Sequence, residues 1–177
     1  LFSKPIGGLI WSHDVGDVSN DILVSIGETV SDNAALVDKR LMVLSTSIIG
    51  QVDTGTWIVG TNQPKLDTGT VANVPYYIWL IMRADTGVVD ILFSASGTAP
   101  TMPANYAHKR LIGWFLRTAG INVPLTVVEE SGGGIHLTWV TPPNDVALAS
   151  LTTARQTDAL SVPAAFSVLV NIRAIVD

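Results

Sequence analysis

The sequence predicts an all-β fold, a β-sandwich for which we expect jelly-roll topology. Short apolar runs rich in Val, Ile, Thr and aromatic residues recur along the chain, and turn-forming groups separate them at intervals of about 8–12 residues. Sustained helical spacing is missing, and residues 34–43 are the one stretch that could make a short helical turn. The turn-forming groups are Asp53-Thr54-Gly55, Asp67-Thr68-Gly69, Asp85-Thr86-Gly87, Gly132-Gly133-Gly134 and Pro142-Pro143-Asn144-Asp145.

The length of 177 residues is enough for one domain with a full hydrophobic core and too short for two independent domains to be the default. We therefore predict a single β-sandwich domain over residues 1–177. The sequence begins at Leu1, without Met and without the pattern of a signal peptide, so we expect the domain to be part of a longer product.

Two hairpins are predicted from the turns between apolar runs. Residues 76–83 and 88–94 flank the short link 84–87, whose Gly87 can adopt the positive φ of a bulge-type turn. Residues 125–130 and 135–140 form the second hairpin. In its second strand Ile135, Leu137 and Trp139 share one face while His136 and Thr138 share the other, which predicts a half-buried strand.

Three further strands are expected. One contains Ile22, Val24 and Ile26 and ends at Gly27, and another covers residues 41–47. The last strand lies at the end of the chain, where apolar residues alternate with Ser167, Asn171, Arg173 and Asp177. Leu169 and Ile175 interrupt its polar face, so we expect this strand to contact a neighbouring chain. Its alternating apolar residues are Phe166, Val168, Val170, Ile172, Ala174 and Val176.

The composition predicts a homo-oligomer. Hydrophobic residues make up 47% of the chain and charged residues only 14%, whereas soluble domains carry about 25% charged residues. The most apolar run, residues 76–82, is too short to cross a bilayer, which needs about 20 residues, so we expect no membrane insertion. Contact with other chains is the remaining way to cover so much apolar surface.

The charge and the cysteine count exclude several kinds of partner and cofactor. The net charge is -5, and the ten basic residues are scattered instead of forming the stripe that phosphate binding requires. We therefore expect no nucleic-acid partner. The chain has no cysteine, which excludes disulfides and cysteine metal sites, and we expect no cofactor.

Residues 19–113 carry a series of short motifs in a defined order. They are Ser19-Asn20-Asp21-Ile22 with Gly27; Lys39-Arg40-Leu41; Trp57-Ile58-Val59-Gly60-Thr61-Asn62; Leu66-Asp67-Thr68-Gly69; Tyr76-Tyr77-Ile78-Trp79-Leu80-Ile81 with Arg83; Asp85-Thr86-Gly87-Val88-Val89-Asp90-Ile91-Leu92-Phe93-Ser94; Pro100-Thr101-Met102-Pro103-Ala104-Asn105-Tyr106; and Lys109-Arg110-Leu111-Ile112-Gly113. The ordered series resembles a block of phage and prophage tail-fibre and virion-structural proteins. Leu160-Ser161-Val162-Pro163-Ala164 is similar to the end of that block.

The resemblance implies that the protein is located in the virion, that it is not an enzyme, and that its homo-oligomer is a trimer. Two segments depart from the block: Gln63-Pro64-Lys65 stands where a Gly-rich turn is expected, and residues 45–55 are longer than expected. We expect these departures to remodel one exposed loop.

The residues that could support catalysis do not form a recognisable pattern. Ser94 and Ser96 lie in a segment without the leading Gly of a nucleophile elbow, so we interpret them as strand-end hydroxyls. The three histidines, His13, His108 and His136, are isolated from one another and from carboxylates at metal-ligand spacing. Glu129 and Glu130 would point to opposite faces of a strand. We therefore predict no catalytic residues.

Acidic and amide side chains near the start of the chain allow two interpretations. Their oxygens could bind Ca²⁺, although the alternating ligands and final Glu of an EF-hand loop are absent. They could instead form turns by accepting hydrogen bonds from the nearby backbone, which is the interpretation that we favour. We therefore assign no metal site. The residues are Asp14, Asp17, Asn20, Asp21, Asp32 and Asn33.

A ligand-binding surface is predicted around Trp57, next to Asn62, Gln63 and Lys65 in the unusual loop, with Trp11 as a second aromatic candidate. Trp79 and Trp139 lie in apolar runs and are expected to be buried with their N–H groups bonded. The expected function is a tail-fibre, receptor-binding tip for host attachment through surface polysaccharide. Capsid decoration, or another purely architectural role among virion proteins, is the alternative. A polysaccharide depolymerase is a third and weaker candidate.

Overall fold

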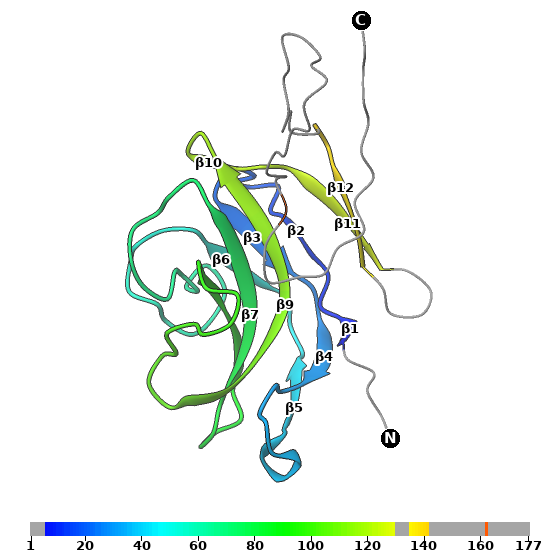
Figure 1. Ribbon diagram of the computed structural model, residues 1–177, viewed down its shortest axis with the longest axis vertical. Helices are drawn as coiled ribbons and strands as arrows, with labels where there is room; N and C mark the ends of the chain where they lie inside the picture. The colour runs from blue at the N-terminus through cyan, green and yellow to red at the C-terminus, as the bar shows by residue number, and fades with distance from the viewer. Residues whose placement is uncertain (1–5, 130–134, 142–161, 163–177) are drawn as a thin grey trace, which may run out of the picture.

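The computed structural model describes residues 6–129, 135–141 and 162, and these residues form an all-β fold of several antiparallel sheets (Figure 1). This confirms the prediction of an all-β fold, while the β-sandwich architecture stays a prediction. The strands are β1 (Ile6–Gly8), β2 (Trp11–His13), β3 (Asp21–Val24), β4 (Gly27–Val30), β5 (Leu41–Leu44), β6 (Ile48–Gln51), β7 (Pro75–Arg83), β8 (Val89–Ser94), β9 (Tyr106–Thr118), β10 (Ile121–Asn122), β11 (Leu125–Glu129) and β12 (Ile135–Trp139), with the 3-10 turn η1 (Leu36–Asp38) between β4 and β5.

Three bent segments of the chain build two small sheets. β1 and β2, β3 and β4, and β5 and β6 follow one another closely, and each pair contributes one strand to the sheet β1-β4-β5 and one to the sheet β2-β3-β6. The first segment bends at Gly8 and Leu9, which both have positive φ angles, of 67° and 56°. Opposite this bend, a Cβ atom on Gly27 would collide with the Gly7 carbonyl oxygen and the Leu9 nitrogen, so only glycine fits there.

The third sheet has the order β10-β9-β7-β8 and contains the first predicted hairpin. β7 pairs antiparallel with β8 on one edge and with the long strand β9 on the other. The pairing with β9 shifts register between Ile78 and Trp79 and again between Met82 and Arg83. Gly87 in the hairpin link has a φ of 72°, as its sequence position predicts.

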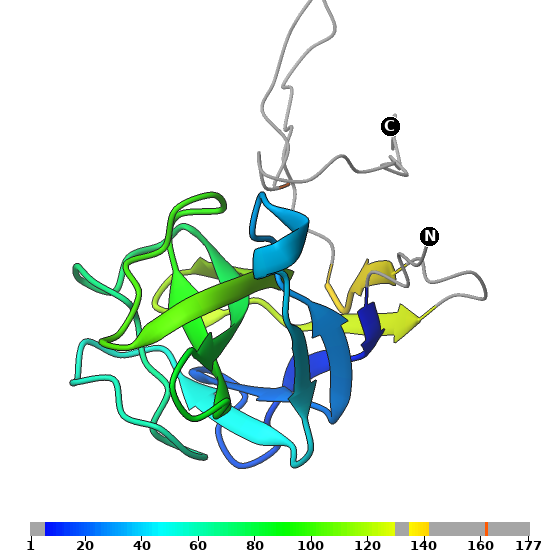
Figure 2. The ribbon, with the colours of Figure 1, turned by 90° about the horizontal axis from the view of Figure 1, so that it is seen from below.

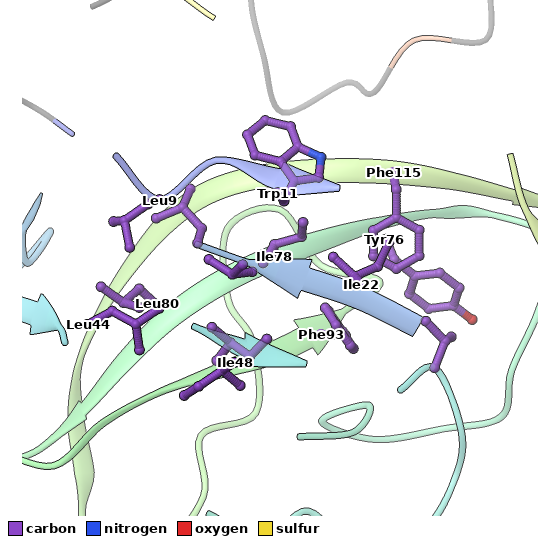
Figure 3. Close-up of a cluster of buried hydrophobic side chains, with 14 of the residues drawn as sticks. Leu9, Trp11, Ile22, Leu44, Ile48, Tyr76, Ile78, Leu80, Phe93 and Phe115 are labelled. Carbon is purple, nitrogen blue, oxygen red and sulfur yellow. The ribbon is translucent and has the colours of Figure 1, made fainter. Parts of the chain in front are cut away.

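The strand β7 lacks charged residues from Tyr76 to Met82, because both of its faces are buried there. Tyr76, Ile78 and Leu80 pack into the central core with Phe93 and Phe115 (Figure 3). On the opposite face Tyr77, Trp79 and Ile81 form a second cluster with Leu92, Tyr106 and Trp114. A strand covered on two sides gains from apolar residues at every position, so the run lacks the polar alternation of an exposed sheet.

Residues 61–67, which we call the bridging segment, lie between β6 and β8 and hydrogen-bond to both. On the β6 side the Asn62 N–H donates to the Ile49 carbonyl at 2.8 Å. On the β8 side the Asp67 N–H donates to the Phe93 carbonyl at 2.8 Å, and the Phe93 N–H donates to the Lys65 carbonyl at 3.2 Å. Leu66 also forms a parallel bridge with Phe93. The bridging segment thereby joins the bent sheets to β8 around one interior (Figure 2).

The second predicted hairpin is present as β11 and β12, paired from Leu125↔Trp139 to Glu129↔Ile135. Its predicted faces are confirmed where the side chains are described: His136 and Thr138 are exposed, whereas Leu137 and Trp139 are half-buried. Trp139 was expected to be buried, and it instead packs edge-on against Trp114 with 5.7 Å between ring centroids.

Other predictions need smaller corrections or stay open. β3 ends at Val24, and Ile26 is exposed at the bend before β4 instead of continuing the strand. β5 ends at Leu44 and not at residue 47, and the possible helical turn at 34–43 shrinks to η1. The terminal strand 166–177 lies outside the described residues, and jelly-roll topology stays a prediction. Within the described part of the chain, no helix is long and apolar enough to span a membrane.

Close packing at Gly113 yields a first test of the fold. A Cβ atom at this position would lie 2.7 Å from the ring of Trp11, which is itself only 2% exposed. We predict that Gly113→Ala lowers the free energy of unfolding by about 1–3 kcal/mol, because the ring has little room to move. Urea denaturation measures this, with Thr118→Ala at the exposed end of the same strand as the control. Equal stability of the two variants would contradict the packing described here.

Candidate binding surface

The loop between β6 and β7 carries four of the five predicted ligand-binding residues. Trp57 anchors this loop, because its indole N–H donates to the Ile91 carbonyl at 2.9 Å and its ring meets Tyr106 edge-on with 5.0 Å between centroids. The Trp57 side chain is half-buried. It is therefore a fixed part of the second hydrophobic cluster with some exposed surface, and not a free aromatic platform.

Asn62 and Gln63 are the exposed polar residues at the tip of this loop. Asn62 has a φ of 62°, and the Gln63 N–H donates to the Gly60 carbonyl at 3.1 Å, which closes a tight turn. Ile58 and Val59 precede this turn and are about half exposed, at 51% and 50%. The tip thus presents two amide side chains beside two aliphatic side chains on a backbone that is fixed by the bridging segment.

Lys65 and Trp11 do not fit the predicted ligand surface. The Lys65 ammonium group donates to the Gln51 amide oxygen at 2.7 Å and pairs with the Asp53 carboxylate at 2.5 Å, and its side chain is only 12% exposed. The charge of Lys65 is therefore paired within the loop and is not free to bind a ligand. Trp11 lies in the central core with Leu9 and Ile22, away from solvent (Figure 3). A core side chain cannot form a surface platform, so the prediction for Trp11 was wrong.

An open groove of about 480 Å³ adjoins the loop. Its walls come from the end of β5 and the following bend, from the bridging segment, and from the turn between β7 and β8. The hydroxyl side chains of Ser45, Thr46, Ser47 and Thr61 line it together with aliphatic side chains. The lining residues are Val43, Leu44, Ser45, Thr46, Ser47, Ile48, Gly60, Thr61, Gly87, Val88 and Val89.

Asp90 is a buried carboxylate beneath the loop, and sequence reasoning missed it. It is 0% exposed, and its two oxygens accept the N–H groups of Gly60 and Ile91, each at 2.7 Å. Burial raises the pKa of Asp90, and these two hydrogen bonds oppose the increase. The nearby Tyr106 hydroxyl is buried without a hydrogen-bond partner among the described residues. Asp90 thus fixes the loop at Gly60 at an electrostatic cost.

Two of the acidic residues near the start of the chain, Asp14 and Asp17, form turns, which was the favoured interpretation. Asp17 accepts hydrogen bonds from the N–H groups of Ser19 and Asn20 and from the Asn20 amide. Asp14 accepts the Gly16 N–H at 2.8 Å, and Asp32 pairs with a lysine on β9, Lys109. The described residues contain no group of three or more His, Asp or Glu side chains that could hold a metal ion.

Arg117 is a second buried charged group that the sequence did not reveal. Only 6% of it is exposed, and its guanidinium donates to the Ser19 carbonyl at 3.0 Å and to the Asn20 and Asn122 amide oxygens at 2.8 and 2.9 Å. It also donates to the Gly120 carbonyl. These bonds hold the turn between β2 and β3 against the end of β9, so Arg117 has a structural role.

The hydroxyl and imidazole groups considered for catalysis have structural partners. The Ser94 hydroxyl donates to Asp67 at 2.8 Å and accepts the Ser96 N–H at 2.9 Å, which fixes the end of β8. His13 Nδ1 lies 3.1 Å from the Val18 carbonyl, and His108 Nδ1 lies 3.1 Å from the Asn33 amide oxygen. Burial lowers the pKa of His13. Among the described side chains no hydrogen bond joins a serine hydroxyl to a histidine ring, and His136 is exposed. The side chains of Glu129 and Glu130 lie outside the described part.

Comparison with known proteins adds no relative: the chain matches no protein-family model, no curated protein and no solved structure.

The burial of Asp90 predicts a pH dependence of stability. The pKa of Asp90 in the folded protein is raised above the ordinary 3.8, so the folded state binds the proton more readily than the unfolded state. The resulting penalty is absent below pH 3.8 and grows as the pH rises through the folded-state pKa. Asp90→Asn keeps an acceptor for the Gly60 N–H and has no charge. Its stability relative to the native protein should therefore increase between about pH 4 and pH 7.

Urea denaturation of both proteins across this pH range measures the difference, in which the contributions of other carboxylates cancel. The carboxylate of Asp85 is the matched control, because its exposed pairing with Arg83 lowers its pKa to about 2. Asp85→Asn should therefore not gain stability over the native protein as the pH rises. A stability difference for Asp90→Asn that is independent of pH would contradict the proposed cost of burial.

Proposed function

We propose that this chain is a non-enzymatic structural domain of a bacteriophage particle and works as one subunit of a homo-oligomer, a trimer of β-sandwich domains of jelly-roll type. The observation that carries the proposal is a set of exposed apolar side chains on η1, β5 and the β7–β8 turn, which we call the apolar rim. Its members and their exposed fractions are Leu36 (83%), Val37 (79%), Leu41 (59%), Val43 (46%) and Val88 (40%).

The apolar rim is continuous in the fold. Leu41 and Val43 point outward from β5, since Met42 and Leu44 between and after them are buried. Val43 and Val88 line the same groove, so the rim extends from β5 to the β7–β8 turn. A strand that is apolar on both faces, of which the described part of its own chain buries only one, indicates contact with another chain.

The virion part of the proposal is supported by the ordered motifs in residues 19–113. The structural hydrogen bonds of Ser94, His13 and His108 support a non-enzymatic role. In the receptor-binding version, the loop tip contacts host surface polysaccharide through Asn62 and Gln63, beside Ile58 and Val59 and the exposed part of Trp57. Each contact is weak, and the identical subunits multiply it. Capsid decoration is the second candidate function. The apolar rim supports it equally, because the rim would then pack against other virion proteins.

The oligomer is tested by sedimentation equilibrium of the isolated chain. We predict a mass of three copies of the 18.8 kDa chain, and at least about tenfold weaker association for the double variant Leu36→Ser, Leu41→Ser. Val15→Ser is the control, because Val15 is 94% exposed in the turn between β2 and β3, at the far end of the bent segments from β5 (Figure 1). A stable native monomer would overturn the proposal.

Binding of the oligomer to purified host envelope polysaccharide separates the two versions. The receptor-binding version predicts binding that Asn62→Ala and Gln63→Ala weaken several-fold while the oligomer mass and stability stay unchanged. An absence of binding, together with normal adsorption of particles that lack the domain, would leave the architectural role. New reducing ends in the polysaccharide would instead reveal a depolymerase.

A further inference from the structure

We propose that the free edge of β5 accepts an extended segment from a neighbouring copy as an added β-strand, and that this segment is residues 166–176. The inference rests on the homo-oligomer proposed above and specifies how its subunits join. It adds backbone pairing to the side-chain contacts of the apolar rim.

The hydrogen bonds between β4 and β5 determine which backbone groups of β5 point away from β4. The Ser31 N–H donates to the Arg40 carbonyl at 2.9 Å, so these two residues form a hydrogen-bonded pair next to Val30↔Leu41. Hydrogen-bonded pairs alternate along an antiparallel ladder, which makes Thr29↔Met42 the next bonded pair. The N–H and C=O groups of Leu41 and Val43 therefore point toward the free edge of the strand.

The pairing of β4 with β1, on its other side, gives the same assignment of which residues of β4 bond to β5. The Leu9 N–H donates to the Ile26 carbonyl at 3.2 Å, directly beside the pair Gly8↔Gly27. Ile26 therefore faces β1, and the residues one step along, Gly27 and Thr29, face β5. Two independent hydrogen bonds therefore agree that the N–H and C=O groups of Leu41 and Val43 point toward the free edge of β5.

Among the described residues no strand pairs with this edge of β5, whereas the corresponding edge of β6 is covered. The bridging segment covers β6 through the bonds from Asn62 to Ile49 and from Gln51 to Pro64. Leu41 and Val43 form the non-hydrogen-bonded pairs with β4, and within the described part of the chain their outward N–H and C=O groups have no backbone partner. Proteins usually protect such an edge with a charge, a proline or a bulge, or by keeping the edge strand short. Leu41-Met42-Val43-Leu44 is a short strand, but it contains neither charge nor proline and pairs in regular register. An apolar edge of this kind is available for pairing with another strand.

The groove described above lies beside this edge of β5. Val43 and Leu44 line one side of the 480 Å³ groove, and Gly87, Val88 and Val89 line the other. The side chains of Leu44 and Ile48 are buried at 3% and 8% exposure and give the groove an apolar base. A strand added along β5 would place alternate side chains against this base and the others outward beside Leu41 and Val43.

The terminal segment has the sequence that this position requires. Its alternate residues from Phe166 to Val176 are apolar and match the base of the groove, while Ser167, Asn171 and Arg173 would face solvent. Leu169 and Ile175 on that outer face would meet the exposed side chains of β5. The described strands already have partners in their own sheets. A cyclic trimer allows each copy to donate this segment to the next, because such head-to-tail contacts close into a ring.

Substitution of Val43 separates backbone pairing from side-chain packing. Val43→Pro removes the outward N–H and leaves the bonds from β5 to β4 in place, since proline is tolerated on an edge strand. Val43→Ala removes apolar surface and keeps the N–H. We expect Val43→Pro to weaken association at least about tenfold more than Val43→Ala in sedimentation equilibrium, with native-like thermal unfolding of both variants. Equal association of the two variants would overturn strand addition.

Disulfide trapping identifies the strand, and it does not depend on how well the proline variant folds. The chain has no cysteine, so each introduced thiol is unique. Val43→Cys in one tagged population is mixed with a second population that carries a single cysteine at position 168, 169, 170, 171 or 172. The mixture is dissociated, reassembled and oxidised.

We expect a disulfide between differently tagged chains that peaks at one or two of these positions with alternating yield. A cysteine in place of Val15 on the first population is the control and should give no crosslink. If native protein is monomeric, the oligomer proposal and this inference both fail. If it is oligomeric and no position crosslinks between chains, or if the link forms only within one chain, this inference alone fails.

Discussion

The backbone pairing of the bridging segment with β6 and β8 is the interaction on which the rest of this structure depends. Phe93 is its centre, because its N–H and C=O groups bond to Lys65 and Asp67 and its ring meets Phe115 edge-on in the core. A Cβ on Gly50 would lie 2.7 Å from the same ring, so β6 also packs closely against it. The bridging segment and Phe93 therefore hold the bent sheets, the core and the exposed loop tip together.

This arrangement explains why the surface features considered for function lie on loops without being loosely held. Asp90 binds Gly60, and Asp67 accepts both the Ser94 hydroxyl and the Thr101 N–H at 2.8 Å. Both carboxylates lie under or beside long connections and satisfy their backbone donors. A loop whose conformation is fixed in this way loses little entropy when it binds, which suits a repeated weak contact with a polymer or a neighbouring protein.

The parts of the fold that could be predicted are those determined by residues close together in the sequence. Both hairpins follow from short turns between apolar runs, and the turn role of Asp17 follows from its nearby backbone donors. Burial of Trp11 was not predictable, because Trp11-Ser12-His13 is too short to show which face is inward, and the ring is covered by Gly113 from a distant strand. Asp90 and Arg117 were missed for a related reason, since their partners Gly60 and Ser19 lie far away in the sequence. The bridging segment contains Asn62 and Pro64, which favour a loop, and its backbone hydrogen bonds to β6 and β8 depend on strands that the local sequence does not reveal.

Native-state amide hydrogen exchange at the bridging segment is the most direct test of this account. We expect the N–H groups of Asn62, Asp67, Gln51 and Phe93 to exchange as slowly as those in the β7–β9 pairing, because they open only when the core opens. Exchange of Asn62 and Asp67 at the rate of exposed loop amides, while β7 and β9 remain protected, would show that the segment is not part of the cooperative fold and would contradict the account.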